Sequence, residues 1–179
     1  KEVKRDIEYI TREQYYEILE LCFTIRDKLI VAFMFEGELR LSEVLGMHIE
    51  DLEIWDNKIN IVHRDNLQNG ARVKNNAEGY IFLPEYVMDL LSEYILTELD
   101  EYDTNFLFVN LNGKNKGKPM KSITVQKLFE RFSREMGIQV HPHMCRHGFA
   151  TERLEAGWQL IDIKDALRHT HISSTDIYT

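Results

Sequence analysis

Cysteine is scarce in this sequence: the 179 residues include only two, Cys22 and Cys145. Two cysteines do not make a disulfide framework, so a small disulfide-stapled fold is excluded. The sequence also lacks an apolar run long enough to span a bilayer, and it shows no signal-peptide pattern. We therefore expect a protein of a reducing, cytoplasmic setting that has no membrane partner.

Positively charged residues are also fewer than negatively charged ones. The sequence has 22 lysines and arginines and 30 aspartates and glutamates, which gives a formal net charge of -8. An overall charge of this sign argues against nucleic-acid binding. Acidic residues, however, concentrate in residues 36–56 and 78–103, whereas residues 114–134 are mostly basic. On charge alone this basic segment is either a DNA-binding face or a solvated helix and loop. Its basic residues are Lys114, Lys116, Lys118, Lys121, Lys127, Arg131 and Arg134.

The length suits one domain with a sizeable core. Helix caps and apolar spacing predict helices that begin at Thr11, span 27–35, follow Ser42 as a cap, span 84–99, run from a cap at Ser122 to Gly137, and follow Pro142. Alternating or β-branched residues predict strands at 52–55, 58–63 and 80–83, with a turn at 56–57 and a polar loop at 66–76. The predicted fold is α+β, mainly helical, with a small three-stranded antiparallel sheet.

Titratable residues gather behind Pro142, a residue that is well tolerated at a helix start. On the helix that follows, His143, Arg146 and His147 stand at i, i+3 and i+4 and share one face. Arginine offers forked donors to phosphate oxygens, and histidine exchanges protons near neutral pH. This face is therefore a candidate anion site. His169 follows downstream, and Tyr178 stands nine residues after it.

This combination resembles the catalytic domain of the tyrosine recombinases, the family of phage and transposon integrases. Their pattern is His-x-x-Arg, then Leu-Gly-His, then a nucleophilic tyrosine nine residues after that histidine. His143 and Arg146 match the first motif, and His169 and Tyr178 match the others. One departure is Arg168, which stands where the family usually has glycine. A side chain at that position predicts a different local backbone or substrate approach.

The resemblance extends to Arg40, because Arg40-Leu41-Ser42-Glu43 fits the Arg-x-Ser-Glu string that carries the family's first catalytic arginine. One extra residue separates Gly37 from Arg40 relative to that pattern. The resemblance implies that Arg40 binds the scissile phosphate and that Glu43 supports the site by hydrogen bonding. Taken alone, Arg40 would instead be a surface arginine paired with a nearby acid.

The family places a catalytic lysine in the hairpin between the second and third strands, and Lys74 is our candidate. Arg72 is the nearest basic competitor, and we expect it to contact DNA. A solvated hairpin lysine is the alternative explanation for Lys74. His147 is either a supporting residue of the site or a helix histidine with local partners.

The resemblance implies site-specific recombination that integrates or excises a mobile element. Tyr178 would attack a DNA phosphodiester and form a 3′-phosphotyrosyl intermediate, while Lys74 protonates the leaving 5′ oxygen. His143 would assist proton transfer, and His169 would hydrogen-bond the phosphate. No metal, cofactor or ATP is implied.

The implied partner is double-stranded DNA at specific recombination sites, bound by a homotetramer. Residues 1–10 are then a linker from an N-terminal DNA-binding domain, and residues 11–179 are the catalytic domain. The first residue is not Met and the chain ends directly after Tyr178, so we expect a fragment that lacks a C-terminal tail and is a monomer in isolation.

Two other functions fit part of the pattern. A metal hydrolase could use His141, His143, His147, His169 and His171, since histidines at i and i+4 can chelate zinc. No glutamate follows His143 in the His-Glu-x-x-His spacing of such enzymes. A recombinase-derived regulator that binds DNA without cutting it is the second alternative. A type IB topoisomerase uses similar chemistry, but the residues around His143 look more like an integrase.

Overall fold

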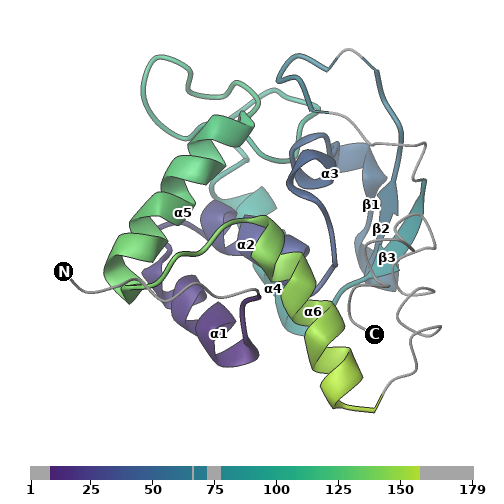
Figure 1. The fold of residues 1–179 in the computed structure, drawn as a ribbon. Coiled ribbons are helices and arrows are strands. Elements are labelled where there is room, and N and C mark those ends of the chain that lie inside the picture. The colour runs from purple at the N-terminus through teal and green to yellow at the C-terminus, as the bar shows by residue number, and fades with distance from the viewer. Residues whose placement is uncertain (1–8, 66, 72–77, 158–179) are drawn as a thin grey trace.

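In the computed structural model, residues 9–65, 67–71 and 78–157 are described. Helices surround one central helix, and a small sheet lies at one edge of the domain (Figure 1). The helices are α1 (Arg12–Leu21), α2 (Ile25–Phe35), α3 (Leu41–Leu45), α4 (Glu85–Leu96), α5 (Ser122–Met136) and α6 (His143–Glu155). The strands are β1 (Leu52–Glu53), β2 (Lys58–Ile61) and β3 (Gly79–Phe82), and short 3-10 turns cover Ile49–Asp51 and Ile54–Asp56.

Helix α2 is the centre of the core. All seven residues from Leu29 to Phe35 are buried, and the helix contacts α1, α3, α4 and α6. A helix that is apolar on every side must be covered on every side, because each exposed face would cost hydrophobic free energy. This confirms the strongly apolar helix predicted for this stretch, which begins slightly earlier, after the Thr24 cap.

The helix ends follow the capping rules with two corrections. Thr11 caps α1 as predicted: its hydroxyl accepts from the Gln14 amide at 3.2 Å, and the Gln14 side chain accepts from the Thr11 amide at 2.9 Å. The predicted caps Ser42 and Ser122 were wrong by up to two residues, because both lie inside their helices. Helix α5 ends at Gly137 as predicted, in the left-handed conformation at φ 73°.

The sheet is antiparallel with the strand order β1-β2-β3. Ile59 pairs with Ile81 on the buried face, and Asn60 pairs with Tyr80 on the outer face. The first strand is shorter than predicted. Residues 54–56 form a 3-10 turn because the chain reverses at Asn57, which adopts the left-handed conformation expected of a turn asparagine.

Four tyrosines pack against other side chains or the backbone. Tyr15 and Tyr94 are fully buried, and the Tyr94 hydroxyl donates to the Leu107 carbonyl at 2.7 Å. The Tyr86 hydroxyl lies 2.6 Å from that of Tyr15. Tyr80 is 54% exposed and packs on the outer face of the sheet, where its ring lies against Phe82 and Lys58.

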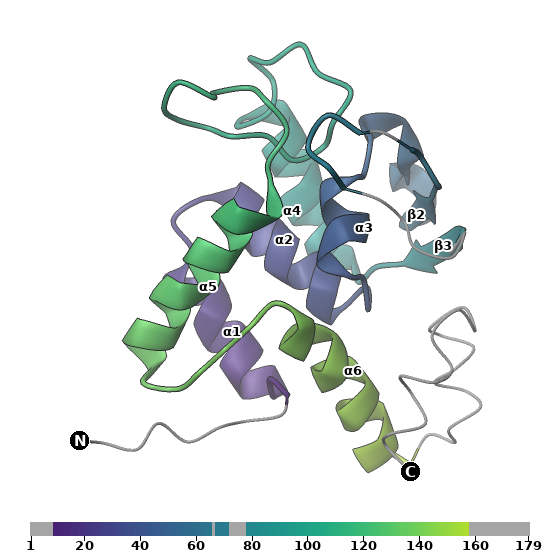
Figure 2. The same ribbon diagram turned by 45° about the horizontal axis from the view of Figure 1, so that its top comes forward.

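The basic loop forms a closed hairpin, which we call the basic hairpin (residues 110–118). The Asn110 amide donates to the Lys118 carbonyl at 2.9 Å, and the Gly117 amide donates to the Asn110 carbonyl at 2.7 Å. Before it, Leu107, Phe108 and Val109 are buried, as the apolar run predicts. The hairpin and α5 lie beside each other on one side of the molecule (Figure 2).

Three arginines join distant segments, two through carboxylates and one through a backbone carbonyl. Arg12 of α1 pairs with Glu36 after α2 and with Glu152 of α6. Arg64 after β2 pairs with Asp51 at 2.6 Å and with Glu50 at 3.0 Å. Arg26 pairs with Asp27 and donates to the Val109 carbonyl.

Within the described residues, no helix combines the length and the apolarity that crossing a membrane requires.

Candidate active site

Helix α6 is anchored to the core on one side. Cys145 is fully buried, as predicted, and Met144 is nearly so. The Ile10 amide donates to the Met144 carbonyl at 3.2 Å. Gly148 lies so close to the Ile10 carbonyl and to the Phe35 ring that no side chain would fit there. This close packing fixes the rotation of α6, and Arg146 lies on the helix side where it can reach the turn after α2.

Arg146 is tied to that turn. Its Nε donates to the backbone carbonyl of Glu38 at 3.1 Å. Glu38 has a left-handed backbone, with φ 56°, and is almost fully buried. A non-glycine residue in this conformation costs about 1–2 kcal/mol, and such residues cluster at functional sites. Glu38 lies in the stretch that is one residue longer than the family pattern, and its carbonyl supports Arg146.

Gly37, which precedes Glu38, allows this turn because it has no side chain. A Cβ at Gly37 would lie 2.5 Å from the Phe33 carbonyl oxygen and 2.8 Å from a methyl carbon of Ile81. Contacts this short require the backbone or the sheet to move. The glycine therefore lets the chain leave α2 while it is pressed against β3.

Arg40 immediately precedes α3, and it rather than Ser42 takes the cap position. The Glu43 carboxylate accepts from the Arg40 backbone amide at 2.8 Å, and Glu43 is only 3% exposed. Glu43 thus holds the backbone from which the Arg40 side chain extends. The support of the site that we expect from Glu43 stays a prediction, and this hydrogen bond to the main chain of Arg40 is compatible with it.

Arg40, His143 and Arg146 line one cleft of about 410 Å³. Leu39, Leu41, Gln126 and Pro142 form the rest of its lining. The fold therefore brings together three of the residues that sequence motifs had selected from two distant segments. Two guanidinium groups and an imidazole around one cleft can bind a phosphate through charge-assisted hydrogen bonds.

The surroundings of His143 disfavour its protonated form. Its pKa is lowered from the ordinary histidine value, first by burial and then by the nearby His141. The two rings stack with their centroids 5.6 Å apart. The His141 side chain is exposed, and its backbone carbonyl accepts from the Met144 amide at 3.0 Å at the start of α6. A neutral imidazole can accept a proton, and a bound phosphate would favour its protonated form.

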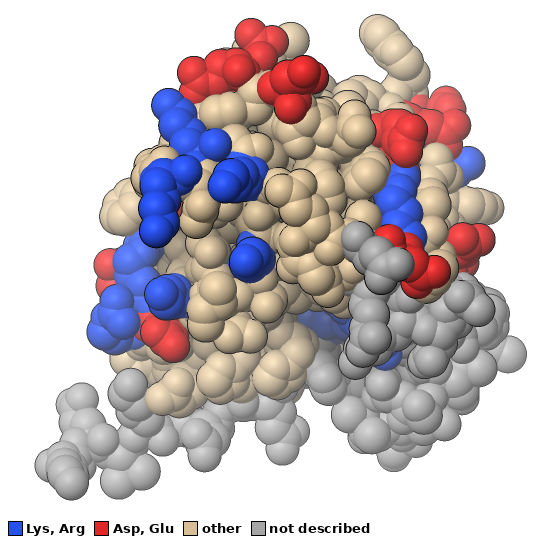
Figure 3. Space-filling model, turned by 90° about the horizontal axis from the view of Figure 1, so that it is seen from above, with Lys and Arg blue, Asp and Glu red and all other residues tan. Residues whose placement is uncertain are grey.

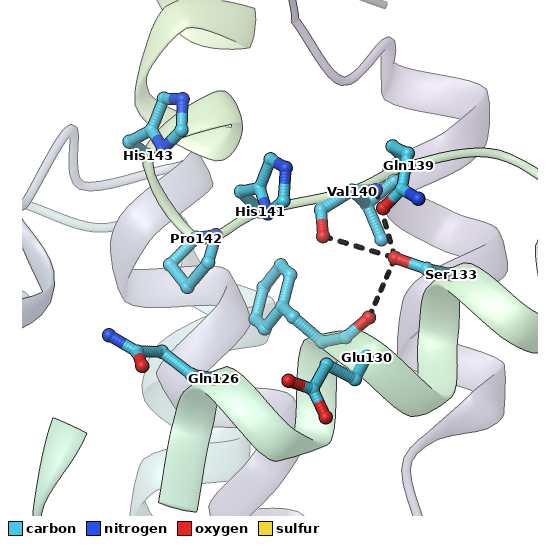
Figure 4. Close-up of a pocket in the computed structure, with 9 residues that line it drawn as sticks. Gln126, Glu130, Ser133, Gln139, Val140, His141, Pro142 and His143 are labelled. Carbon is cyan, nitrogen blue, oxygen red and sulfur yellow. Dashed lines mark hydrogen bonds between the residues drawn. The ribbon is translucent and has the colours of Figure 1, made fainter. Parts of the chain in front are cut away.

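Gln126 is a cleft residue that sequence reasoning missed. It lines the cleft just described and a neighbouring pocket of about 370 Å³ that reaches Glu130, Gln139 and His141 (Figure 4). Its position on α5, on the exposed side opposite the apolar stripe, was the available signal. A single glutamine carries no motif that would separate it from other surface residues.

The side of this pocket away from the cleft is held by Ser133. Its hydroxyl donates to the Phe129 carbonyl at 2.9 Å and accepts from the Val140 amide at 3.0 Å (Figure 4). These bonds fasten the connection to α6 against α5. His143 therefore starts α6 from a fixed point.

The model of the phage integrase family matches residues 8–179 of this sequence. The chain belongs to the phage integrase family. Transposase A from transposon Tn554 of Staphylococcus aureus is 34% identical over 173 residues, which cover 96% of this chain and 48% of that protein. Tyrosine recombinase XerA of Pyrococcus furiosus is 32% identical over 179 residues, covering 100% of this chain and 55% of that protein. The chain thus spans about half the length of these relatives.

Solved structures agree on the fold. A crystal structure of XerA recombinase superposes with a TM-score of 0.76 at 22% identity, covering 100% of this chain and 60% of that one. The Tn1549 transposon integrase, solved in complex with a circular intermediate DNA, gives a TM-score of 0.77 at 20% identity, covering 99% and 62%. The predicted catalytic-domain fold of this family, mainly helical with a three-stranded antiparallel sheet, is confirmed.

Other residues suggested by the family pattern lie outside the described residues: Lys74, Arg72, His169 and Tyr178, together with Arg168 and His171. His147 lies in α6, but its side chain is not described.

Asn69 fixes the chain near Ala71, the last described residue before the segment that contains Lys74. The Asn69 side-chain NH₂ donates to the carbonyls of Leu45 and Met120, each at 2.9 Å. Its oxygen accepts from the Ala71 amide at 3.1 Å.

The predicted DNA-binding residues of the basic hairpin and α5 are exposed, with one exception. Lysines and arginines gather over these two elements (Figure 3). Arg131 is the exception: it donates to the Leu21 carbonyl at 2.9 Å, and its guanidinium lies 4.3 Å from the centre of the Phe23 ring. Arg131 therefore joins α5 to the end of α1.

Within the described residues, no group of three or more His, Cys, Asp or Glu side chains is arranged to hold a metal ion. The expectation of a metal-free reaction stays a prediction, because three of the five histidines proposed for the alternative metal site have undescribed side chains.

Proposed function

We propose that this chain is the catalytic domain of a site-specific DNA recombinase that cuts and rejoins the ends of a mobile element. One observation carries the proposal: Arg40, His143 and Arg146 line a single cleft although two distant segments supply them. Two arginines can neutralise the two nonbridging oxygens of a phosphodiester, which otherwise repel a nucleophile.

Tyr178 supplies the nucleophile in this proposal. Its phenolic oxygen bonds to phosphorus, the bond from phosphorus to the 5′ oxygen breaks, and the 3′-phosphotyrosyl intermediate forms. Lys74 gives a proton to the leaving 5′ oxygen, and neutral His143 takes the phenolic proton. His169 hydrogen-bonds the phosphate. Attack by a 5′-hydroxyl of another strand reverses these steps and needs no ATP, because the phosphotyrosyl bond conserves the energy of the broken one.

The substrate is duplex DNA, which fits the names of relatives that are transposon proteins and of a structural neighbour solved with DNA. Exchange between two duplexes breaks four strands. Because each chain has one nucleophile, we expect four copies on two duplexes. Contacts to flanking phosphates come from the exposed basic residues Lys114, Lys116, Lys118, Lys121, Lys127 and Arg134, together with Arg72.

The same proposal places residues 1–10 as the link to an N-terminal DNA-binding domain, and it places the protein in the cytoplasm with its DNA. An N-terminal domain would grip the other face of the duplex. Sedimentation of the intact protein with its recombination site would test the tetramer: one copy per duplex at every concentration contradicts it.

A covalent adduct tests the chemistry directly. The intact protein is incubated with a duplex carrying the joined ends of its element, nicked beside the cleavage position so that the cleaved end is lost. We expect an adduct that survives denaturant and maps to Tyr178 by mass spectrometry. Tyr178→Phe should abolish the adduct, whereas Tyr80→Phe, which changes an exposed tyrosine on β3, should retain it.

The alternative functions give different results in the same assay. Tight binding without any adduct would identify a DNA-binding regulator. Cleavage without an adduct that stops when a chelator is added would identify a metal hydrolase.

A further inference from the structure

A second pocket suited to an anion lies between the basic hairpin, the first turn of α5 and Gln68. Its volume is about 330 Å³. The polar residues that line it are Gln68, Asn110, Asn115, Lys118, Lys121 and Thr124. They provide three amides, one hydroxyl and two ammonium groups, and no carboxylate lines the pocket. Such a donor-rich lining suits phosphate oxygens.

The two lysines of this pocket differ from their neighbour Lys116 in what lies opposite them. Lys116 pairs with Glu101 at 3.5 Å and lies over the Tyr102 ring. Among the described residues, neither Lys118 nor Lys121 has a carboxylate within ion-pair distance. The pocket therefore holds two ammonium groups without an opposing carboxylate, unlike Lys116. Unopposed exposed lysines attract phosphate at ordinary ionic strength.

The backbone around the pocket is held in place. The Lys118 amide donates to the Asn115 carbonyl at 2.9 Å, and the Asn110 side chain donates to the Lys118 carbonyl at 3.1 Å. Helix α5 begins at Ser122, directly after Lys121, so the positive end of its dipole adds to the two lysines. Donors that are already positioned lose less freedom when a ligand binds.

The pocket is a neighbour of the active cleft. Thr124 lines the pocket and Gln126 lines the cleft, and both belong to the first two turns of α5. Their walls are thus separated by about the width of a helix, about 10 Å. A backbone phosphate close to the scissile phosphate can therefore reach this pocket while the scissile phosphate lies in the cleft.

We propose that this pocket binds one backbone phosphate of the DNA, close to the scissile phosphate, and so fixes where the strand is cut. The scissile phosphate enters the cleft of Arg40 and Arg146 while its neighbour occupies the pocket of Lys118 and Lys121. This inference rests on the proposed function. It adds a second anchor, because one phosphate contact alone would let the DNA pivot.

Neutral phosphates test the proposal. Single methylphosphonates are placed at successive positions on both strands of the recombination site. Affinity is measured with the intact protein carrying Tyr178→Phe, so that no cleavage intervenes. We expect one position near the scissile phosphate where neutralisation weakens binding about tenfold, as loss of a charge-assisted hydrogen bond would. In Lys118→Gln/Lys121→Gln, the same methylphosphonate should cause no further loss.

The matched control is Lys114→Gln/Lys116→Gln, which removes equal charge from the same hairpin but from residues that do not line the pocket. This control variant should bind every DNA more weakly, but the methylphosphonate at the sensitive position should still reduce its affinity further. Equal behaviour of the two double variants, or a loss spread evenly over all positions, would overturn the proposal.

Two further measurements, a competition with inorganic phosphate and the adduct assay, complete the test. Replacing chloride by inorganic phosphate at matched ionic strength should weaken DNA binding more in Lys114→Gln/Lys116→Gln, which keeps the pocket, than in Lys118→Gln/Lys121→Gln, because free phosphate competes for the same donors. Equal weakening in the two double variants would overturn the proposal. The adduct assay on unmodified DNA judges the proposed function separately: a position-specific loss without an adduct supports the pocket while rejecting the recombinase.

Discussion

Arg64 and Lys121 carry the same charge, but the groups that face them differ. Arg64 lies between two carboxylates, and its side chain is 18% exposed. Lys121 is exposed beside amides and, within the described residues, has no carboxylate at ion-pair distance. The first arrangement holds two segments together, whereas the second presents charge to a partner. A net charge of -8 therefore says little about binding, because a sum over the chain does not show which basic side chains lie opposite carboxylates and which face the solvent.

The largest expected effect is on stability, from Arg64→Met. This change leaves Asp51, which is 4% exposed, buried without its cation. Removing one partner of a buried ion pair typically costs about 3 kcal/mol, because the remaining charge is desolvated and unpaired. We expect urea unfolding to show a loss of this order. DNA affinity of the folded protein should stay unchanged, and a large fall would break the distinction between the two groups of basic residues.

The next effect is on DNA binding, from Lys127→Gln/Arg134→Gln on α5. Both residues are exposed, so the free energy of unfolding should change by no more than about 0.5 kcal/mol for each. The slope of log affinity against log salt should fall by about 0.9 for each DNA phosphate that the variant no longer neutralises. Fluorescence anisotropy over a salt series measures it.

Arg131→Gln is the matched control on the same helix. Because Arg131 bonds the Leu21 carbonyl and lies over Phe23, this variant should lose about 1 kcal/mol of stability and keep the salt slope. A reduced slope for Arg131→Gln would place this residue among the DNA contacts after all.

A smaller effect concerns pH. The pKa of His48 is lowered, first by burial and then by the charge of Arg64, while Asp51 and Glu50 oppose the shift. The unfolded chain therefore binds a proton to His48 at a higher pH than the folded chain does. Stability contributed by neutral His48 should be complete above the ordinary histidine pKa of about 6.5 and should fall as the pH drops below it.

Urea unfolding from pH 7.5 to pH 5 measures this dependence, and His48→Gln should flatten it. Arg64→Met should also reduce the slope, because it removes a charge that opposes protonation. An unchanged slope in His48→Gln would assign the pH dependence to other groups.

The smallest expected effect is on the pH profile of cleavage. His141 lowers the pKa of His143, so His141→Ala should raise it. If neutral His143 accepts the phenolic proton, the acid limb of adduct formation should move to higher pH in this variant. A profile that does not move would remove His143 from the proton-transfer step.

The sequence predicted the elements whose signals are local. The Thr11 cap, the apolar run of α2 and the Gly137 end each depend on a few adjacent residues, and the family motifs selected Arg40, His143 and Arg146 for one site. Residue spacing alone could not show that Glu38 adopts a left-handed backbone and supports Arg146, because a sequence motif does not specify backbone dihedral angles.

Other features depend on which distant groups meet. Arg131 matched the basic pattern of α5, but the Leu21 carbonyl and the Phe23 ring that hold it come from the other end of the chain. Gln126 had no distinguishing pattern, and its importance comes from the two clefts it separates. Ser42 and Ser122 were misplaced because capping residues are also common just inside helices.

The Asn69 side chain has a consequence for how the domain can move. Its NH₂ group needs two carbonyl acceptors and its oxygen needs an amide donor, and Leu45, Met120 and Ala71 supply them. Neither aspartate nor leucine could satisfy all three. Leu45 ends α3, the helix that follows Arg40, so the chain at Ala71 is joined to the unit that positions Arg40. A motion that shifts Ala71 relative to Arg40 must therefore break this amide junction.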